Sequence, residues 1–156
     1  LLFDVTLRVP LIMHVPGMVQ TGAVCKDVVE LLDLYPTLTE LCNISSPEHL
    51  EGKSLAPMLA RPQKKRDHAA YAMAKVGDRT HESIGRTITT NRWRYTEWDD
   101  NPRRSELYDH KNDRQEHHNV ADKPEFGAIK TQLRQRLHEV KLDPKIVDMK
   151  NTVRNE

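Results

Sequence analysis

The uneven distribution of apolar residues constrains the fold of this 156-residue chain more than any other feature of its sequence. Residues 1–60 include 31 apolar residues, whereas the remaining 96 residues include only 27. The charge changes at the same place, because the first part has 3 Lys and Arg against 7 Asp and Glu, and the second has 21 against 16. We therefore expect two unlike parts, the second of them basic and suited to anionic partners.

Residues 61–68 mark the expected boundary between the two parts, because this segment is charged and has no apolar side chain. The chain as a whole is 30% charged and has no long apolar run, which excludes a membrane protein. Two cysteines, Cys25 and Cys42, are too few for a disulfide framework and match no zinc spacing. The first residues lack an initiating Met and the features of a signal peptide, so we expect the chain to begin inside a longer protein.

The first part contains one strand pattern and two helix patterns. The branched apolar run of residues 7–17 predicts a buried strand, with His14 as a core histidine. Asp33 is the expected N-cap of a helix that continues to Asn43 and has three leucines on one face. A short helical stretch is expected at residues 54–60.

The second part predicts a small antiparallel sheet packed by one helix. The expected strands are residues 69–76, 84–89, 92–98 and 106–109. Trp93, Tyr95 and Trp98 alternate or nearly alternate, which favours a role in the core over stacking on a sugar. A capping-box pattern at Asp122 predicts a helix over residues 123–141 whose apolar stripe covers the sheet. The stripe consists of Ile129, Leu133, Leu137 and Val140.

Several phrases of the sequence are more specific than its composition. They are Phe3-Asp4, Arg8-Val-Pro-Leu-Ile, Pro16-Gly17, Asp33-Leu-Tyr-Pro-Thr-Leu, Leu50-Glu-Gly-Lys-Ser-Leu, and Glu106-Leu-Tyr-Asp with Asp113, Glu116 and Asn119-Val-Ala. In their order and spacing these phrases resemble the C-terminal end of sulfatases. The segment from Gly85 to Trp98 is most similar to the iduronate-2-sulfatase branch of that family.

The resemblance implies an α/β fold, namely the C-terminal part of an alkaline-phosphatase-like sulfatase that ends in a small antiparallel sheet packed by a C-terminal helix. Residues 1–60 are then the end of the catalytic domain, residues 61–142 a small α+β subdomain, and residues 143–156 a flexible tail. The resemblance also implies a secreted, periplasmic or lysosomal enzyme that hydrolyses sulfate esters with calcium and a formylglycine made from Cys or Ser.

The catalytic groups that the resemblance implies are missing from this sequence. Neither Cys25 nor Cys42 begins the Cys/Ser-x-Pro-x-Arg motif, no Asp-Asp or Asp-His pair suits the calcium site, and the Lys that holds the sulfate would precede Leu1. We expect the full-length protein to act on sulfated sugars such as the 2-sulfate of iduronate in glycosaminoglycans. We expect this chain alone to bind neither calcium nor another cofactor and to be inactive.

We expect the chain to help select the substrate through a basic loop. The substrate-binding candidates are Lys75, Arg79, His81 and Arg86, because a sulfated uronic acid carries a second anion that needs basic partners. The alternative is that these four residues are solvated surface charges. The histidines of residues 110–118 lie in a polar turn and are not expected to bind a metal.

Two other functions stay open at this point. The basic second part could bind nucleic acid or another polyanion, although 16 acidic residues are mixed into it and no nucleic-acid signature is present. A phosphatase or phosphodiesterase of the same superfamily is a further alternative. The expected partners are a sulfated carbohydrate and the missing N-terminal catalytic part, and neither nucleic acid nor a membrane. Uncovered apolar surface in residues 1–59 predicts self-association.

Overall fold

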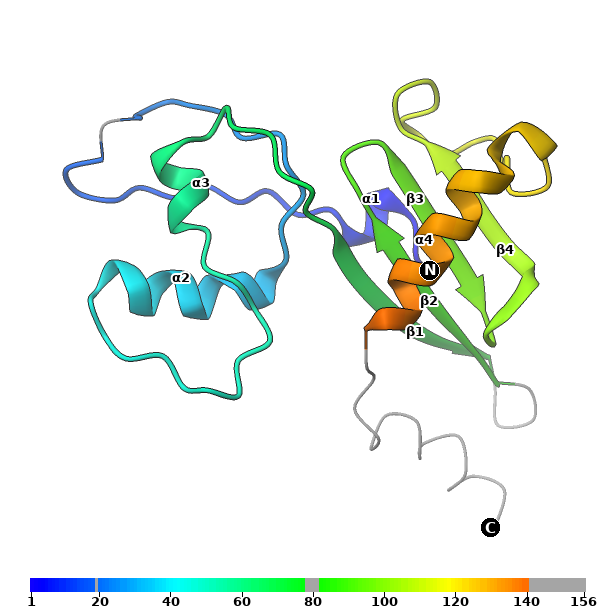
Figure 1. Ribbon diagram of the computed structural model, residues 1–156, viewed down its shortest axis with the longest axis horizontal. Coiled ribbons are helices and arrows are strands. Elements are labelled where there is room, and N and C mark those ends of the chain that lie inside the picture. The colour runs from blue at the N-terminus through cyan, green and yellow to red at the C-terminus, as the bar shows by residue number, and fades with distance from the viewer. Residues whose placement is uncertain (19, 78–81, 141–156) are drawn as a thin grey trace, which may run out of the picture. The chain divides into compact units, whose positions relative to one another are not determined.

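The computed structural model describes residues 1–18, 20–77 and 82–140, and these residues form two compact units (Figure 1). Of the described residues, the sheet unit contains 1–7, 71–77, 82–88 and 92–140, and the helical unit contains 8–18, 20–70 and 89–91. The first seven residues therefore belong with the sheet, although they are far from it in the sequence. The expected tail, residues 143–156, lies outside the described residues.

The sheet has four strands, which neighbour one another in the order in which they occur along the chain. The strands are β1 (Ala70–Gly77), β2 (Glu82–Thr89), β3 (Trp93–Trp98) and β4 (Asn101–Asp109). β3 pairs antiparallel with β4, and the short connections between neighbours make the sheet a meander. The predicted small antiparallel sheet is confirmed, and β4 begins five residues earlier than expected. Tyr95 is fully buried in the core, as predicted.

One face of the sheet is covered by α4 (Gly127–Glu139), which follows the 3-10 turn η2 (Pro124–Phe126) (Figure 1). Leu133 and Leu137 of the predicted stripe are buried, each 2% exposed. The predicted capping box at Asp122 is wrong, since Lys123 is the N-cap of η2 and no side chain caps either helical segment. Pro124 has a fixed φ and no N–H to satisfy, so it can begin the turn without a side-chain cap.

The opposite face of the sheet is covered by the first residues of the chain. Leu2 is buried, and α1 (Asp4–Leu7) follows it. Gly85 of β2 provides the space for Leu2, because a Cβ at this position would lie 2.7 Å from Leu2 Cδ1 and 2.7 Å from Trp98 Cζ3. Position 85 is therefore a glycine because the Leu2 side chain and the Trp98 ring approach the backbone there, and not because the strand bends.

The helical unit contains η1 (Leu31–Asp33), α2 (Leu34–Leu41) and α3 (Ala56–Ala60), so both predicted helices are present. Asp33 is the N-cap residue of α2, as predicted, but its side chain forms no capping hydrogen bond with that helix. Its carboxylate accepts hydrogen bonds from the backbone N–H of Glu30 at 3.0 Å and of Lys53 at 2.8 Å. The Asp33 side chain thus joins the start of the helix to the loop that leads to α3.

The predicted strand at residues 7–17 is wrong, because the structure shows irregular backbone after α1. Ile12 is 93% exposed, and His14 is exposed and not in a core. A strand needs a neighbouring strand to satisfy its N–H and C=O groups, and none of the described residues pairs with this segment. None of the helices in the described part of the chain has the length and apolar content that a membrane crossing requires.

Candidate functional site

The predicted site residues that the structure describes, Lys75 and Arg86, lie in the neighbouring strands β1 and β2. β1 ends at Gly77 and β2 begins at Glu82, and the connection from β3 to β4 is Asp99–Asp100. Because consecutive strands run in opposite directions, the β1–β2 and β3–β4 connections lie at the same end of the sheet. The predicted residues Arg79 and His81 lie outside the described residues, so the structure places only Lys75 and Arg86.

Lys75 is a partly exposed residue near the end of β1. Its Nζ lies 2.8 Å from Glu82 Oε2 at the start of β2, and the two side chains are 36% and 29% exposed. A pair this accessible to water contributes about 1 kcal/mol or less to stability. Lys75 can therefore exchange Glu82 for an anionic ligand at small energetic cost.

Arg86 has a different environment and is buried under the end of α4. Its Nη2 donates hydrogen bonds to the Leu137 carbonyl at 2.8 Å and to the Val140 carbonyl at 3.2 Å, and its Nη1 lies 3.4 Å from Asp100 Oδ1. A positive charge at the C-terminus of a helix satisfies carbonyls that have no partner in the helix. In this structure Arg86 fixes α4 on the sheet.

The β3–β4 connection adds basic residues that the sequence analysis did not select. Trp98 pairs with Asn101 whereas Glu97 pairs with Ser105, so residues 102–104 bulge out of the ladder. Asp99 and Asp100 both have a positive φ, near 55°, which suits a tight hairpin turn. Bulges of this kind redirect side chains and are common near active sites. In the sequence, the pair Asp99-Asp100 directly after the predicted strand at residues 92–98 indicates this turn.

The bulge leaves one arginine exposed and ties another to the turn. Arg104 contacts the Asp99 carboxylate, which also accepts hydrogen bonds from the Ile84 N–H at 2.9 Å and the Ser83 hydroxyl at 3.0 Å. Arg103 is exposed and forms no ion pair with the described residues. We call this end of the sheet the charged rim. Among the described residues it consists of Lys75, Glu82, Arg86, Asp99, Asp100, Arg103 and Arg104.

Asp100 of the charged rim also belongs to a group of possible metal ligands, but this group does not suit calcium. Oxygen or nitrogen atoms of Glu97, Asp100 and His138 lie within 4.8 Å of one another. Calcium takes six to eight oxygen ligands, whereas this group offers two carboxylates and one ring nitrogen. Both oxygens of Glu97 already have partners, among them the guanidinium of Arg134. The described residues therefore do not form the calcium site that the fold family implies.

The two cysteines and the histidines of residues 110–118 are the other candidates for a catalytic or metal-binding group among the described residues. Cys25 and Cys42 are free and exposed, and neither is followed by the residues of the formylglycine motif. His110 is buried against Glu116, with its Nε2 2.6 Å from Oε1. His118 is 80% exposed beside Asp113. These histidines do not converge on a common metal position in the described structure.

The fold places the protein in the class of alkaline-phosphatase-like sulfatases, of which it resembles the C-terminal part. Residues 1–143 match the family described as N-sulphoglucosamine sulphohydrolase, C-terminal. The chain belongs to this family.

Individual relatives agree with this class. Human arylsulfatase K is 30% identical over an alignment of 151 positions, and the match covers 93% of this chain and 28% of that protein. Delta 4,5-hexuronate-2-O-sulfatase of Bacteroides thetaiotaomicron is 30% identical over an alignment of 156 positions, and the match covers 98% of this chain and 31% of that protein. The solved structure of a 2-O GAG sulfatase is 31% identical with a TM-score of 0.55, and the match covers 69% of this chain and 23% of that one. This chain thus spans less than a third of each of these relatives.

Proposed function

We propose that this chain is the C-terminal part of a sulfatase that hydrolyses sulfate esters of carbohydrates, and that its charged rim helps to select the substrate. The family match over residues 1–143 is the observation that carries this proposal. The nucleophile, a formylglycine, and a calcium ion that neutralises charge on the sulfate are then supplied by residues outside this chain. The rim offers cations at the end of the sheet where a bulge exposes them.

The finer proposal is a uronic acid sulfated at its 2-position, as in the iduronate units of glycosaminoglycans. Two of the relatives named above are a hexuronate 2-O-sulfatase and a 2-O GAG sulfatase, which supports a substrate of this type. Such a sugar presents a carboxylate next to the sulfate, and basic side chains bind carboxylates with charge-assisted hydrogen bonds. Lys75, Arg103 and Arg104 are the accessible basic residues of the rim, and of the two arginines only Arg104 is paired with Asp99.

The proposed role of the rim predicts an effect on substrate binding and not on the chemical step. In the full-length protein, Lys75→Ala with Arg103→Ala should raise KM for a 2-O-sulfated uronate disaccharide by about 10-fold or more and leave kcat nearly unchanged. Lys111→Ala with Lys123→Ala also removes two positive charges, from exposed positions after the far end of β4, and serves as the control. Steady-state kinetics on this disaccharide and on a 6-O-sulfated glucosamine tests the proposal. An unchanged KM in the double variant would contradict it.

The alternatives make different predictions for the same protein. A polyanion- or nucleic-acid-binding module would bind heparin or nucleic acid at physiological salt without turnover, and small sulfated sugars would not compete. A phosphatase or phosphodiesterase would prefer phosphate esters over sulfate esters with the same leaving group. Turnover of sulfate esters by the full-length protein would exclude the first alternative, and the preferred ester would decide the second.

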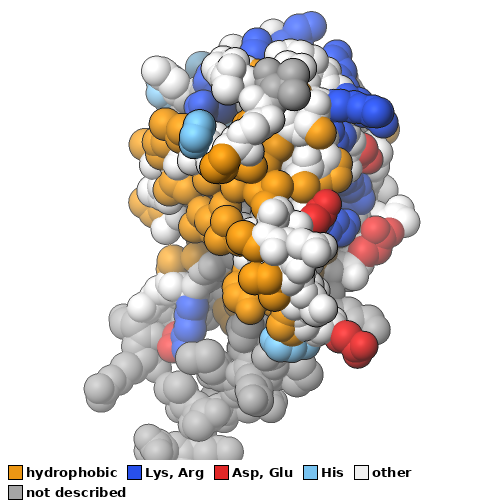
Figure 2. Space-filling view, turned by 90° about the vertical axis from the view of Figure 1, so that its left-hand side faces the viewer, with side chains coloured by type: hydrophobic (Ala, Val, Ile, Leu, Met, Phe, Trp, Pro, Cys, Tyr) orange, Lys and Arg blue, Asp and Glu red, His pale blue; other side chains and the backbone are white. Residues whose placement is uncertain are grey.

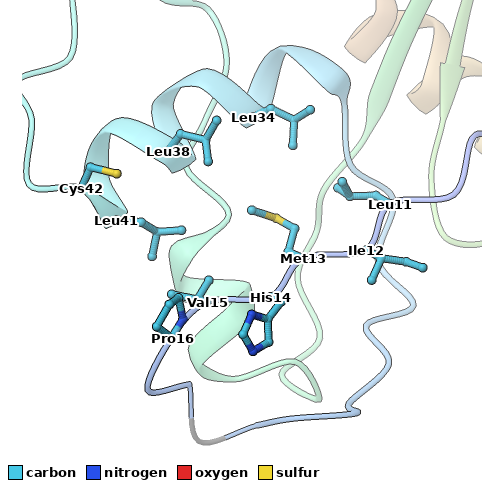
Figure 3. Close-up of a pocket in the computed structure, with 10 residues that line it drawn as sticks. All are labelled: Leu11, Ile12, Met13, His14, Val15, Pro16, Leu34, Leu38, Leu41 and Cys42. Atoms are coloured by element: carbon cyan, nitrogen blue, oxygen red, sulfur yellow. The ribbon is translucent and has the colours of Figure 1, made fainter.

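The helical unit has an apolar groove, which supports the proposal that this chain packs against a further part of the protein. The groove has a volume of about 460 Å³. Residues 11–16 line one side of it, and Leu34, Leu38, Leu41 and Cys42 line the other (Figure 3). Figure 2 shows hydrophobic side chains gathered on this side of the molecule. Ile12 is 93% exposed and Leu38 54% exposed. We propose that the N-terminal part of the sulfatase covers this surface.

The isolated chain is expected to self-associate through the same surface, since an uncovered apolar face of this kind favours association. Ile12→Asp combined with Leu38→Asp should shift the chain toward the monomer in sedimentation velocity and reduce its binding of a hydrophobic dye. Val5→Asp changes an apolar residue that is 87% exposed on α1, outside the groove, and should have no such effect. A wild-type chain that sediments as a compact monomer and binds no dye would contradict the expectation.

A further inference from the structure

Two buried carboxylates lie on opposite faces of the sheet, and each joins the sheet to the segment that covers it. Glu97 lies on the face of α4 and is 1% exposed. It accepts a hydrogen bond from the Tyr95 hydroxyl at 2.7 Å and another from Arg134 Nε at 2.7 Å, and its Oε1 lies 2.8 Å from His138 Nε2. Since Arg134 and His138 belong to α4, this carboxylate fastens the helix to the sheet.

Glu116 performs the equivalent task on the other face. Its Oε2 accepts a hydrogen bond from the backbone N–H of Asp4 at 2.8 Å and contacts Arg94, and its Oε1 lies 2.6 Å from His110 Nε2. The side chains of Arg94, Glu116 and His110 are 0%, 2% and 1% exposed. Glu116 also has a φ of 59°, a conformation that residues with a Cβ adopt only when their surroundings hold them there.

Arg94 depends on the charge of Glu116. Its Nε and Nη1 have no hydrogen-bond partner among the described residues, and its guanidinium lies over the rings of Phe3 and Tyr108 at 5.2 Å and 5.4 Å. Burial lowers the pKa of Arg94, although the charge of Glu116 opposes this effect. Without the Glu116 carboxylate, a buried cation would lose the partner that offsets its desolvation.

We infer that Glu116 is a positioning residue whose negative charge holds residues 2–4 on the sheet, and that acid releases this segment. Three adjacent contacts carry the inference. Leu2 fills the space above Gly85, the Phe3 ring lies against Arg94, and the Asp4 N–H donates to Glu116. The contacts of Phe3 and Asp4 are made with Arg94 and Glu116, so loss of this ion pair should weaken the attachment of residues 2–4 to the sheet.

The direction of the pH effect follows from the surroundings of Glu116. Burial raises the pKa of this carboxyl. The His110 ring, the Asp4 N–H and the Arg94 charge together lower the pKa by more than burial raises it, so the net pKa lies below the usual value. A carboxyl with a lowered pKa stabilises the fold at pH values above its unfolded pKa. This stabilisation is lost as the pH falls through the folded pKa.

Other titratable groups near the pair do not reverse this direction. They are Asp4, Glu106, Tyr108, His110 and Arg114. Glu106 is held by the Trp98 indole N–H at 3.2 Å, and Asp4 by Arg114 at 3.5 Å.

Hydrogen exchange read by mass spectrometry on the 156-residue chain tests the inference without any need for turnover. Glu116→Gln keeps the shape of the side chain and removes its charge. It should lower the protection of residues 2–7 by about 10-fold or more, with α4 unchanged. Glu97→Gln is the matched control, because it removes a buried carboxylate from the other face. It should loosen α4 and leave residues 2–7 protected.

The pH profile separates the role of the charge from a purely structural role. In the wild-type chain, the protection of residues 2–7, corrected for the intrinsic exchange rate, should fall as the solution is acidified. In Glu116→Gln this dependence should be absent. Glu116→Asp, which retains the charge, should restore part of both the protection and its acid dependence, and it replaces Glu116→Gln if the Gln variant does not fold. The inference is overturned if wild-type protection of residues 2–7 does not change with pH, or if the Glu116 and Glu97 variants loosen both segments alike.

Discussion

The isolated 156-residue chain is expected to show no hydrolysis of aryl or sugar sulfates, whereas the full-length sulfatase should turn these substrates over. Hydrolysis of a sulfate ester needs a positioned nucleophile and a cation that neutralises developing charge. The described residues offer neither, because both cysteines lack the formylglycine motif and the group at Glu97 does not suit calcium. The isolated chain should therefore show none of the rate enhancement that the full-length protein has over the uncatalysed reaction.

A discontinuous assay for released sulfate, run on both proteins at equal molar concentration, measures this difference. The full-length protein with its nucleophile replaced by Ala is the control for traces of contaminating sulfatase. Calcium-dependent release of sulfate by the isolated chain, above the level of that control, would show that the chain has its own catalytic centre. The proposed role of the charged rim would then have to be reconsidered.

Gly85→Ala is expected to destabilise the sheet unit by about 1–3 kcal/mol, because a well-packed interior resists an added methyl group. The new Cβ would lie 2.7 Å from atoms of both Leu2 and Trp98. The Trp98 ring is rigid and its indole N–H is bonded to Glu106, so it cannot move away easily. Urea unfolding followed by tryptophan fluorescence measures the change in the free energy of unfolding.

Gly127→Ala gives the control for the effect of replacing a glycine as such. Gly127 begins α4 with a φ of −56°, and a Cβ there would meet no atom within 4 Å. Alanine favours the helix, so this variant should be neutral or more stable by up to about 1 kcal/mol. Equal stability of the Gly85→Ala variant and the wild-type chain would mean that Leu2 does not occupy the position described above.

The sheet and its helix could be predicted from the sequence because their signals are local. The strand patterns on either side of the turn at Thr90-Asn91 and the helical spacing of Leu133 and Leu137 depend only on neighbouring residues. The strand predicted at residues 7–17 failed for the opposite reason. An apolar run of this length indicates burial, but only a partner strand can make it a strand, and the sequence of the run does not reveal that partner.

The candidate site was predicted only in part. Lys75 was selected as part of the predicted basic loop, and the structure places it near the end of β1 beside Glu82, which does not test its role in binding. The burial of Arg86 under α4 joins residues more than 50 positions apart, which no local pattern reports. The same is true of Glu116 and Asp4, whose contact spans 112 positions. Arg103 could have been found from the Asp99–Asp100 hairpin signal, which places the residues after it at the end of the sheet.

The docking of residues 1–7 on the sheet affects how this protein should be dissected in the laboratory. An expression fragment that starts at the boundary seen in the amino-acid sequence, near residue 61, would contain every strand and yet omit Leu2, Phe3 and Asp4. Water would then reach Gly85 and the Arg94 guanidinium directly. A fusion that joins residues 1–7 to Tyr71 through a flexible linker would preserve this cover and is the better starting point for a soluble minimal domain.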